Sequence, residues 1–263
     1  MISHDTLFQP INQSSVVQAI TDQIETLILN GILRDGARLP SERDLAERMN
    51  VSRPKVREAI KQLEQNGLIV VRHGEGNFIA QLLGTAMSDA LIQLYARHTS
   101  AFHDYLEFRL EQERFAARLA AERATVHDRT ILKEVIKILD QAHKDDDPVA
   151  SEQADIQFHS AIVDAGHNSL LVHTMSSIYE LSKQNIFYNR AMLRSIDGTG
   201  EILLQQHHEI CDAIIERDPD AAADAAVRHI EFVRKSYETE QTRVEREATA
   251  LGRIAVFAPT AGK

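Results

Sequence analysis

Apolar side chains recur every three or four residues through most of the chain, the spacing that places them on one face of an α-helix. The first such stretch covers residues 14–30, and its apolar positions are Val17, Ile20, Ile24, Leu27 and Ile28. Two turn signals follow it, Asn30-Gly31 and Asp35-Gly36,. The pattern predicts a helix and then a loop.

Residues 39–79 predict two short helices separated by a tight turn. The helical apolar positions are Leu45, Ala46 and Met49, and then Val56, Ile60 and Leu63. We expect the side-chain oxygen of Ser52 to cap the second helix by accepting a backbone N–H. Pro54 falls in the first turn of that helix, where its missing N–H costs little.

A β-hairpin is predicted directly after this second helix. Asn66-Gly67 ends the helix with residues that tolerate positive φ,. Residues 68–71 and 77–80 read as two strands joined through Gly74-Glu75-Gly76. A helix-turn-helix followed by a β-wing is a shape that places one helix in the DNA major groove.

The rest of the chain predicts helices only, over residues 85–98, 101–124, 128–143, 149–165, 170–191, 201–216 and 219–247. The fold class is therefore mainly α, with an N-terminal winged helix-turn-helix followed by an all-helical bundle of six or seven helices. We expect five segments: a flexible leader (1–13), the DNA-binding domain (14–80), a linker with a connecting helix (81–98), the helical domain (99–241) and a disordered tail (242–263).

Charge and cysteine content narrow the function class. The formal net charge is −10, but residues 1–80 hold nine Lys or Arg against ten Asp or Glu. Within residues 52–61 four basic side chains face one acidic one, so a basic helix lies on a near-neutral domain,. Cys211 is the single cysteine, which excludes a disulfide within the chain and favours a reducing compartment,. There is no secretory signal or long apolar run, so we expect a cytoplasmic protein without membrane contact.

The residues predicted to contact double-stranded DNA are Arg43, Ser52, Arg53, Lys55, Arg57, His73 and Gly74. Arg53 lies near the N-terminus of the second helix and is our candidate for a bidentate guanine contact. Lys55 and Arg57 would contact phosphates or nearby bases, and Arg43 would lie against the backbone. The His73-Gly74 pair at the wing tip would approach the minor groove. The alternative is a solvated basic face.

Polar residues interrupt apolar helix stripes at four positions of the helical domain. Asp155 and His159 are four residues apart, so they share a helix face,. His207 lies on a stripe with Leu203, Ile210 and Ile214, and His229 lies on a stripe with Ala226 and Val233. The four residues Asp155, His159, His207 and His229 are plausible ligands for a divalent transition metal such as Zn, Ni or Mn. Periodicity leaves His208, the neighbour of His207, as an open alternative.

The chain resembles the GntR-type bacterial regulators in LPSERDLAERMNVSRPKVREAIKQLEQNGLI and the following RHGEGNFI. Its helical domain resembles the FCD effector domain of the FadR branch. This resemblance implies a homodimer that binds a short palindromic operator under the control of a small molecule. It also implies the metal set given above, and it favours His207 over His208.

The resemblance further implies two effector-binding residues, Arg109 and Asn168. An Arg fork can pair bidentately with a carboxylate. The alternative for Arg109 is a surface ion pair with Glu113, one turn along a solvated helix face. The alternative for Asn168 is a helix cap.

The sequence favours a transcriptional regulator rather than an enzyme. The resemblance implies a repressor controlled by a small carboxylate such as pyruvate, lactate or glycolate. Fatty acyl-CoA is disfavoured because the members of the family that respond to it lack the metal set. One alternative is a helical-bundle metalloenzyme that uses the Asp/His site for hydrolysis, but no motif supplies its general base. An architectural DNA protein is a further alternative, and it would not need the metal set.

Overall fold

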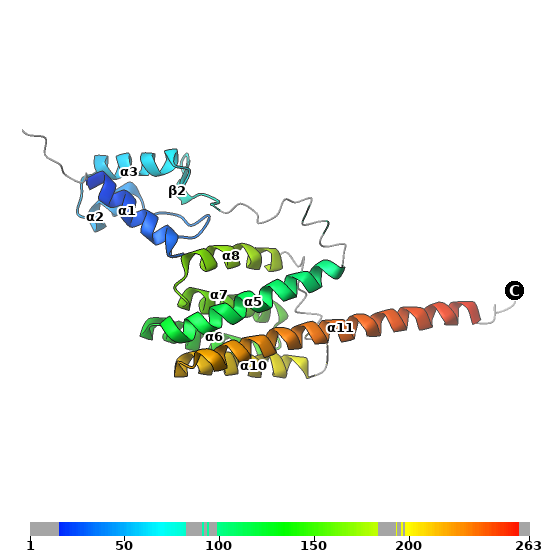
Figure 1. Cartoon of the computed structure of the whole chain (residues 1–263). Helices are drawn as coiled ribbons and strands as arrows, with labels where there is room; N and C mark the ends of the chain where they lie inside the picture. Colours follow the sequence, from blue (N-terminus) through cyan, green and yellow to red (C-terminus); the bar gives the residue numbers. More distant parts are fainter. Residues whose placement is uncertain are drawn as a thin grey trace, which may run out of the picture. The chain divides into compact units, whose positions relative to one another are not determined.

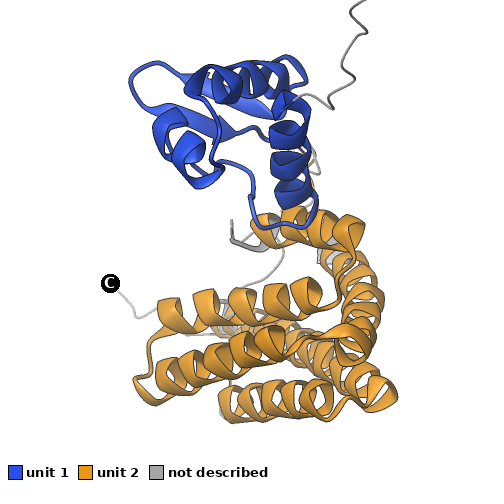
Figure 2. Cartoon of the chain, turned by 90° about the vertical axis from the view of Figure 1, so that its left-hand side faces the viewer, with its two compact units in different colours: residues 1–84 blue, residues 85–263 orange. Residues whose placement is uncertain are grey.

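The computed structural model describes residues 16–82, 91, 94, 99–183, 193, 196 and 198–257. The chain divides into two compact units, residues 1–84 and residues 85–263 (Figure 2). The boundary falls between the predicted DNA-binding domain and the predicted helical domain. Each unit is described by itself.

The first unit contains the predicted helix, helix-turn-helix and hairpin. Its elements are α1 (Val16–Leu29), α2 (Glu42–Arg48), α3 (Arg53–Gln65), β1 (Ile69–Arg72) and β2 (Gly76–Ile79). The two strands pair antiparallel, with Ile69 opposite Ile79 and Arg72 opposite Gly76. Gly74 and Gly76 have φ of 81° and 116°, a region that glycine enters without strain,. The turn chemistry therefore closes the hairpin where the sequence predicts it.

The core of the first unit is made of the apolar stripes that the periodicity identifies. Buried members from α1, α3 and the hairpin are Val17, Ile20, Ile24, Ile28, Val56, Ile60, Leu63, Ile69 and Ile79. One face of each helix is thus removed from water, and the opposite faces stay polar. Burial fixes which side of α3 is turned outward.

The expectation that the Ser52 side chain caps α3 is wrong. Ser52 occupies the N-cap position with extended φ and ψ, but its side chain makes no cap hydrogen bond. Its carbonyl oxygen accepts the N–H groups of Lys55 at 3.0 Å and Val56 at 3.3 Å instead. Pro54 in the first turn brings no N–H of its own. The Ser52 hydroxyl consequently remains exposed at the start of α3.

Helices are the only regular secondary structure among the described residues of the second unit, as the sequence predicts (Figure 1). Its helices are α5 (Thr99–Arg123), α6 (Val126–Lys144), α7 (Pro148–Ala165), α8 (Ser169–Lys183), α10 (Thr199–Glu216) and α11 (Pro219–Phe257). The predicted connecting helix at 85–98 lies outside the described residues except at 91 and 94, and the end of the predicted helix at 170–191 lies outside them too.

Helix α7 is covered by other helices on several sides. It packs against α5, α6 and α8, and half of its 18 residues are buried. Long helices α5 and α11 pack along each other, and α10 packs against both of them and against α6 (Figure 1). A helix covered on several sides needs no single apolar stripe, so polar residues on α7 are removed from water as well.

The prediction of a disordered tail over residues 242–263 is wrong as far as Phe257, because α11 continues to that residue. Residues 238–250 are rich in Glu, Arg, Ala and Gln, which are strong helix formers,. Arg243 pairs with Glu240 at 2.5 Å and with Glu247 at 2.6 Å. Pairs three and four residues apart support a helix from its own surface.

Candidate DNA-binding surface and candidate metal centre

The outward face of α3 carries the predicted basic residues. Arg53, Lys55 and Arg57 are exposed, while Val56 and Ile60 between them are buried. Lys55 pairs with Glu58 at 3.1 Å, and Arg53 forms no ion pair with any described residue. The exposed Ser52 hydroxyl lies at the same N-terminal end of α3. Backbone N–H groups and basic side chains at a helix start suit a phosphate or a base edge.

Arg57 is held across the turn by α2. Its Nε and Nη2 donate to the two carboxylate oxygens of Glu42 at 2.8 to 3.2 Å. This bond with Glu42 raises the pKa of Arg57 above its ordinary value. The pair fixes the direction of the guanidinium, so a DNA contact by Arg57 would be shared with Glu42.

The remaining predicted DNA contacts are exposed on α2 and at the hairpin. Arg43 on α2 has 76% of its side chain exposed. His73 and Gly74 lie at the tip of the β1–β2 hairpin and are exposed too. Next to that tip, the guanidinium of Arg72 lies 4.5 Å from the centre of the Phe78 ring, a cation–π contact between the two strands,.

Three predicted histidines meet inside the second unit. His159 comes from α7, His207 from α10 and His229 from α11, and each is at most 1% exposed. Their ligand atoms all lie within 4.8 Å of one another. His208 points elsewhere: it is partly exposed and pairs with Asp140 at 2.8 Å. The structure therefore places His207, and not His208, with the other two.

Asp155 completes the cluster. Its Oδ1 lies 3.2 Å from Nε2 of His207 and 3.6 Å from Nε2 of His159, and the residue is 2% exposed. Neither ring nitrogen of His159 forms a hydrogen bond within the described part of the chain. Burying such polar atoms is costly unless something satisfies them. Three imidazoles and one carboxylate that converge on a point fit a divalent transition metal, which would remove this cost.

A second layer of polar residues lies against the cluster, and its contacts with the histidines were not predicted from the sequence. Oε2 of Glu113 lies 2.6 Å from Nδ1 of His159, and Oε1 of Glu113 accepts a hydrogen bond from Nε of Arg109. The Tyr179 hydroxyl donates to the same Oε1 at 3.4 Å. Nδ1 of His229 lies 3.1 Å from Oε1 of Gln206.

The available signal for Glu113 was its position on α5. It shares a helical stripe with the buried residues Leu106, Ala116 and Ala120, so an ion pair there interrupts an apolar face,. The alternative of a solvated surface pair is wrong, because Arg109 is 3% exposed and Glu113 is 4% exposed.

Burial and charge set the protonation of this layer. Burial alone would raise the pKa of Glu113, but Arg109 and His159 outweigh it and lower the pKa to about 2. Burial lowers the pKa of His159 in spite of the Glu113 charge. Burial, and then Glu113, raises the pKa of Tyr179 well above its ordinary value. At neutral pH the layer therefore presents a carboxylate, a neutral imidazole and a phenol, and a neutral imidazole is the form that binds metals.

Asn168 lies at the start of α8. Its side-chain oxygen accepts the N–H of Leu171 at 3.2 Å, so it acts as a helix cap,. This is the alternative that the sequence left open. A contact between Asn168 and an effector stays a prediction.

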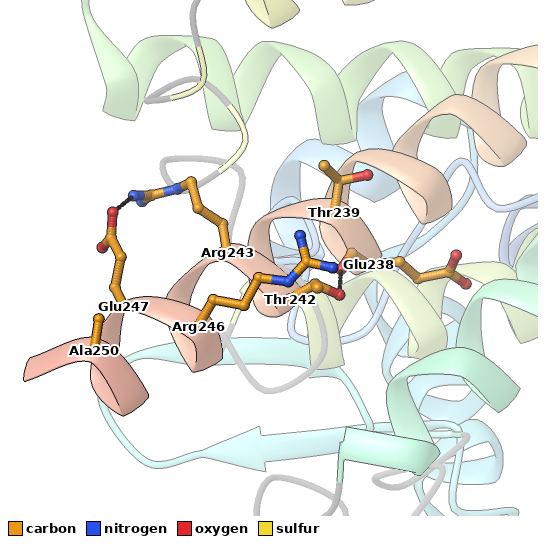
Figure 3. Close-up of a pocket in the computed structure, with 7 residues that line it drawn as sticks. All are labelled: Glu238, Thr239, Thr242, Arg243, Arg246, Glu247 and Ala250. Atoms are coloured by element: carbon orange, nitrogen blue, oxygen red, sulfur yellow. Dashed lines mark hydrogen bonds and ion pairs between the residues drawn. The ribbon is translucent and has the colours of Figure 1, made fainter. Parts of the chain in front are cut away.

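A surface hollow lies along the C-terminal part of α11 (Figure 3). Its lining residues are Glu238, Thr239, Thr242, Arg243, Arg246, Glu247 and Ala250. All seven come from one helix, and Arg243 already pairs with Glu247 there. The hollow contains none of the predicted site residues.

Comparisons with known proteins agree with this division of the chain. Residues 16–79 match the bacterial regulatory proteins of the gntR family, and residues 104–232 match the FCD domain. An L-lactate dehydrogenase operon regulatory protein of Escherichia coli K12 is 33% identical over 85% of this chain and 88% of its own. The Glc operon transcriptional activator of the same strain is 30% identical over 84% and 88%, and its Uxu operon transcriptional regulator is 31% identical over 83% and 85%. No helix among the described residues is both long and apolar enough to cross a membrane.

Proposed function

Because the chain belongs to the GntR family of bacterial regulatory proteins and carries an FCD domain, we propose that it represses transcription from a short palindromic operator and that a small carboxylate controls its operator affinity. The family consists of DNA-binding transcriptional regulators and not of enzymes, which sets aside the metalloenzyme alternative. An architectural DNA protein would leave the buried Asp/His cluster without a purpose. The proposed place of action is the cytoplasm.

The proposed DNA contacts follow the exposed face of α3. Arg53 reads a guanine, Lys55 and Arg57 contact phosphates or neighbouring bases, and the Ser52 hydroxyl contacts a phosphate. Arg43 lies against the backbone, and His73-Gly74 enters the adjacent minor groove. A homodimer presents two such faces to the two halves of a palindrome, since operator symmetry mirrors protein symmetry. The exposure of these residues supports the proposal.

The proposed control site is a divalent metal held by Asp155, His159, His207 and His229. When bound, the metal supplies a positive charge to which a carboxylate can coordinate. The observation that carries this part is the meeting of three buried histidines from three helices around one carboxylate. Metal affinity of such a set depends on neutral imidazoles, and burial keeps His159 in that form,.

The proposed effector is pyruvate, lactate or glycolate. Each carries a second oxygen beside its carboxylate, so it offers two oxygens to one metal. Arg109 is buried, and Glu113 contacts both Arg109 and His159. We expect the guanidinium of Arg109 to pair with the carboxylate of the acid. One relative is named for the L-lactate dehydrogenase operon, which supports a small hydroxy acid.

DNase footprinting of the full chain on the DNA upstream of its own gene tests the proposal. With Zn²⁺ bound, the protected region should lose protection when pyruvate, L-lactate or glycolate is added. His159→Ala should keep the footprint and lose this response, because the ligand set is broken. His208→Gln is the matched control, since His208 lies outside the cluster. Unchanged protection with every 2-oxo or 2-hydroxy acid would contradict the effector class, and a gain of protection would contradict repression.

A further inference from the structure

Glu113 contacts both parts of the proposed control site. It is one of the few acidic residues buried in the second unit, at 4% exposed. Its Oε2 meets His159 of α7, while its Oε1 meets Arg109 of α5 and Tyr179 of α8. One carboxylate thus joins a proposed metal ligand to the proposed carboxylate clamp.

The contact with Glu113 decides how His159 is oriented. Nδ1 of His159 and Oε2 of Glu113 lie 2.6 Å apart without hydrogen-bond geometry, and two lone pairs at that distance would repel each other, so the contact favours a proton on Nδ1,. The lone pair of the neutral ring is then on Nε2, the atom that lies nearest Asp155. A carboxylate that orients a histidine in this way is a recurring arrangement behind metal ligands.

Gln206 contacts His229 in the same way that Glu113 contacts His159, but within the described part of the chain Gln206 does not also contact Arg109. Its Oε1 lies 3.1 Å from Nδ1 of His229, which leaves Nε2 of that ring to face the cluster. Gln206 forms no hydrogen bond with Arg109 or Glu113 among the described residues. The chain therefore offers an internal comparison between a residue that orients only a ligand and one that also holds the clamp.

We propose that Glu113 is a positioning residue that couples the metal centre to the effector clamp: it orients His159 toward the metal and holds Arg109 beside it. Gln206 orients His229 alone. This inference rests on the proposed function. The two oxygens of Glu113 have different tasks, so a side chain of the same shape with one oxygen cannot perform both.

Glu113→Gln tests the first task. A glutamine has one acceptor oxygen and no charge. We expect the charged guanidinium of Arg109 to take that oxygen, so that the His159 contact is lost, and the Arg109 pair is weakened as well because the carboxylate charge is gone. We expect the affinity of the full-length protein for Zn²⁺, measured by competition with a chelating dye, to fall by roughly 10- to 100-fold. Gln206→Met, which keeps the size of the side chain and removes its acceptor, should lower the Zn²⁺ affinity over the same range. Wild-type Zn²⁺ affinity in Glu113→Gln would overturn the inference.

The second task separates the two variants. With each protein saturated in Zn²⁺, titration calorimetry with L-lactate and with pyruvate should show at least a tenfold weaker affinity in Glu113→Gln. Gln206→Met should bind both acids as the wild type does, because its Arg109 clamp is intact. Equal losses in the two variants, or no loss in Glu113→Gln, would overturn the coupling role.

A double variant and histidine spectra separate a loss of stability from a loss of the positioning role. If Glu113→Gln melts early because the buried Arg109 loses the Glu113 carboxylate, the double variant Arg109→Met with Glu113→Gln removes that charge. The double variant should keep near wild-type Zn²⁺ affinity, since its one acceptor can then serve His159, and a loss as large as in Glu113→Gln would contradict the assignment. ¹⁵N-labelled histidine spectra of the metal-free wild type should show a proton on Nδ1 of His159, and a proton on Nε2 would contradict it. A wild type that binds no Zn²⁺ overturns the proposed function itself, whereas normal Zn²⁺ binding in wild type and Glu113→Gln overturns this inference alone.

Discussion

His207 and His208 are neighbours in the chain, yet their surroundings differ completely. His207 is fully buried beside Asp155 and against the Phe158 ring, at 4.9 Å between ring centres. His208 is partly exposed and bonds to Asp140. One step along a helix turns a side chain by about 100°, which is enough to move it from the core to the surface. At the scale of single residues, function here follows the face of the helix.

Arg53→Ala tests the residue that we expect to read sequence. A bidentate guanine contact is worth about 1–3 kcal/mol of discrimination, so specific operator affinity should fall by roughly 10- to 100-fold. Binding to unrelated DNA should change little. Fluorescence anisotropy with operator and scrambled duplexes measures both.

Arg43→Ala is the matched control for Arg53→Ala. Loss of a residue that contacts only phosphate should weaken binding to both duplexes alike. It should also reduce the salt dependence of binding by about one ion. If Arg53→Ala also weakened the two duplexes equally, Arg53 would be a phosphate contact and the assignment would be wrong.

The sequence predicted which polar residues of a single helix are buried, but it did not predict which residues of other helices they contact. Asp155, His159, His207 and His229 stood out because each is polar on an apolar stripe. The relation of Glu113 to His159 and of Gln206 to His229 did not, because spacing along one helix does not report what another helix brings opposite to it. The missing Ser52 cap bond was likewise decided by local geometry, in which the backbone carbonyl served as the acceptor instead.

At the scale of elements, caps and turns set most helix limits. Helix α6 begins with a capping box: Asp128 N–H donates to the Thr125 hydroxyl oxygen, and the Thr125 N–H donates to the Asp128 carboxylate. His167 also lies 2.9 Å from that carboxylate. Apart from the C-terminal end of α11, the helix limits that fall within the described residues lie close to the predicted ones because such signals are local,.

Thr125→Ala should lower the free energy of unfolding of the helical unit by about 1 kcal/mol, the usual cost of losing a cap. Urea denaturation followed by circular dichroism measures it. Thr130→Ala is the comparison, because Thr130 also lies on α6 but only bonds back to the Val126 carbonyl. An equal effect of the two substitutions would contradict a specific role for the box.

Asp128 gives this cap a pH dependence. Burial alone would raise its pKa, but hydrogen bonds from Thr125 and His167 outweigh burial and lower it. Because the folded pKa is depressed, the stabilisation is fully present above the unfolded value of about 3.9 and is lost as pH falls through the folded pKa. The stability difference between wild type and Asp128→Asn should therefore be constant at neutral pH and shrink in acid. A difference that persists at low pH would contradict a charged cap.

The apolar pattern did not predict the C-terminal part of α11. Its apolar periodicity weakens after residue 237, so the predicted helix ends at residue 247 and the predicted ordered domain at residue 241. Helix propensity and pairs such as Arg243 with Glu240 continue the helix to Phe257. Val244, Leu251 and Ile254 lie exposed on this part, so local propensity rather than core packing sustains it.

Ala248→Pro should reduce the helical circular dichroism signal by about the ten residues from 248 to 257,. Zn²⁺ affinity should not change, since all four proposed ligands precede residue 230. Ala248→Gln, another good helix former, should leave the signal as it is. An unchanged signal in Ala248→Pro would show that this segment is not helical in solution.

At the scale of the whole molecule, charge and chemistry are divided between the two units. Residues 81–263 hold 20 Lys or Arg and 29 Asp or Glu, whereas the basic helix lies in residues 1–80. The acidic unit is repelled by DNA, so approach by the basic face of α3 is favoured. The sequence predicted this division, but not the assembly or the path by which one unit affects the other.

Metal binding should stabilise only the helical unit. Zn²⁺ at about 100 times its Kd adds about 2.7 kcal/mol to the free energy of unfolding of the unit that binds it. Chelation should therefore lower the midpoint temperature of one thermal transition and leave that of the other unchanged. His159→Ala should abolish the shift, and His208→Gln should keep it. Differential scanning calorimetry measures both transitions. A shift of the DNA-binding unit, or none at all, would contradict a metal centre in the bundle.

If an acid bound at the metal centre changes operator affinity, thermodynamic linkage requires that the operator also changes the affinity for the acid. The affinity of the Zn²⁺-loaded protein for L-lactate, pyruvate and glycolate is measured with and without saturating operator duplex. If an acid weakens operator binding by a given factor, the operator must weaken binding of that acid by the same factor, in the range of about 5- to 150-fold. We predict this loss for at least one of the three acids. Equal affinity with and without operator for all of them would contradict the account.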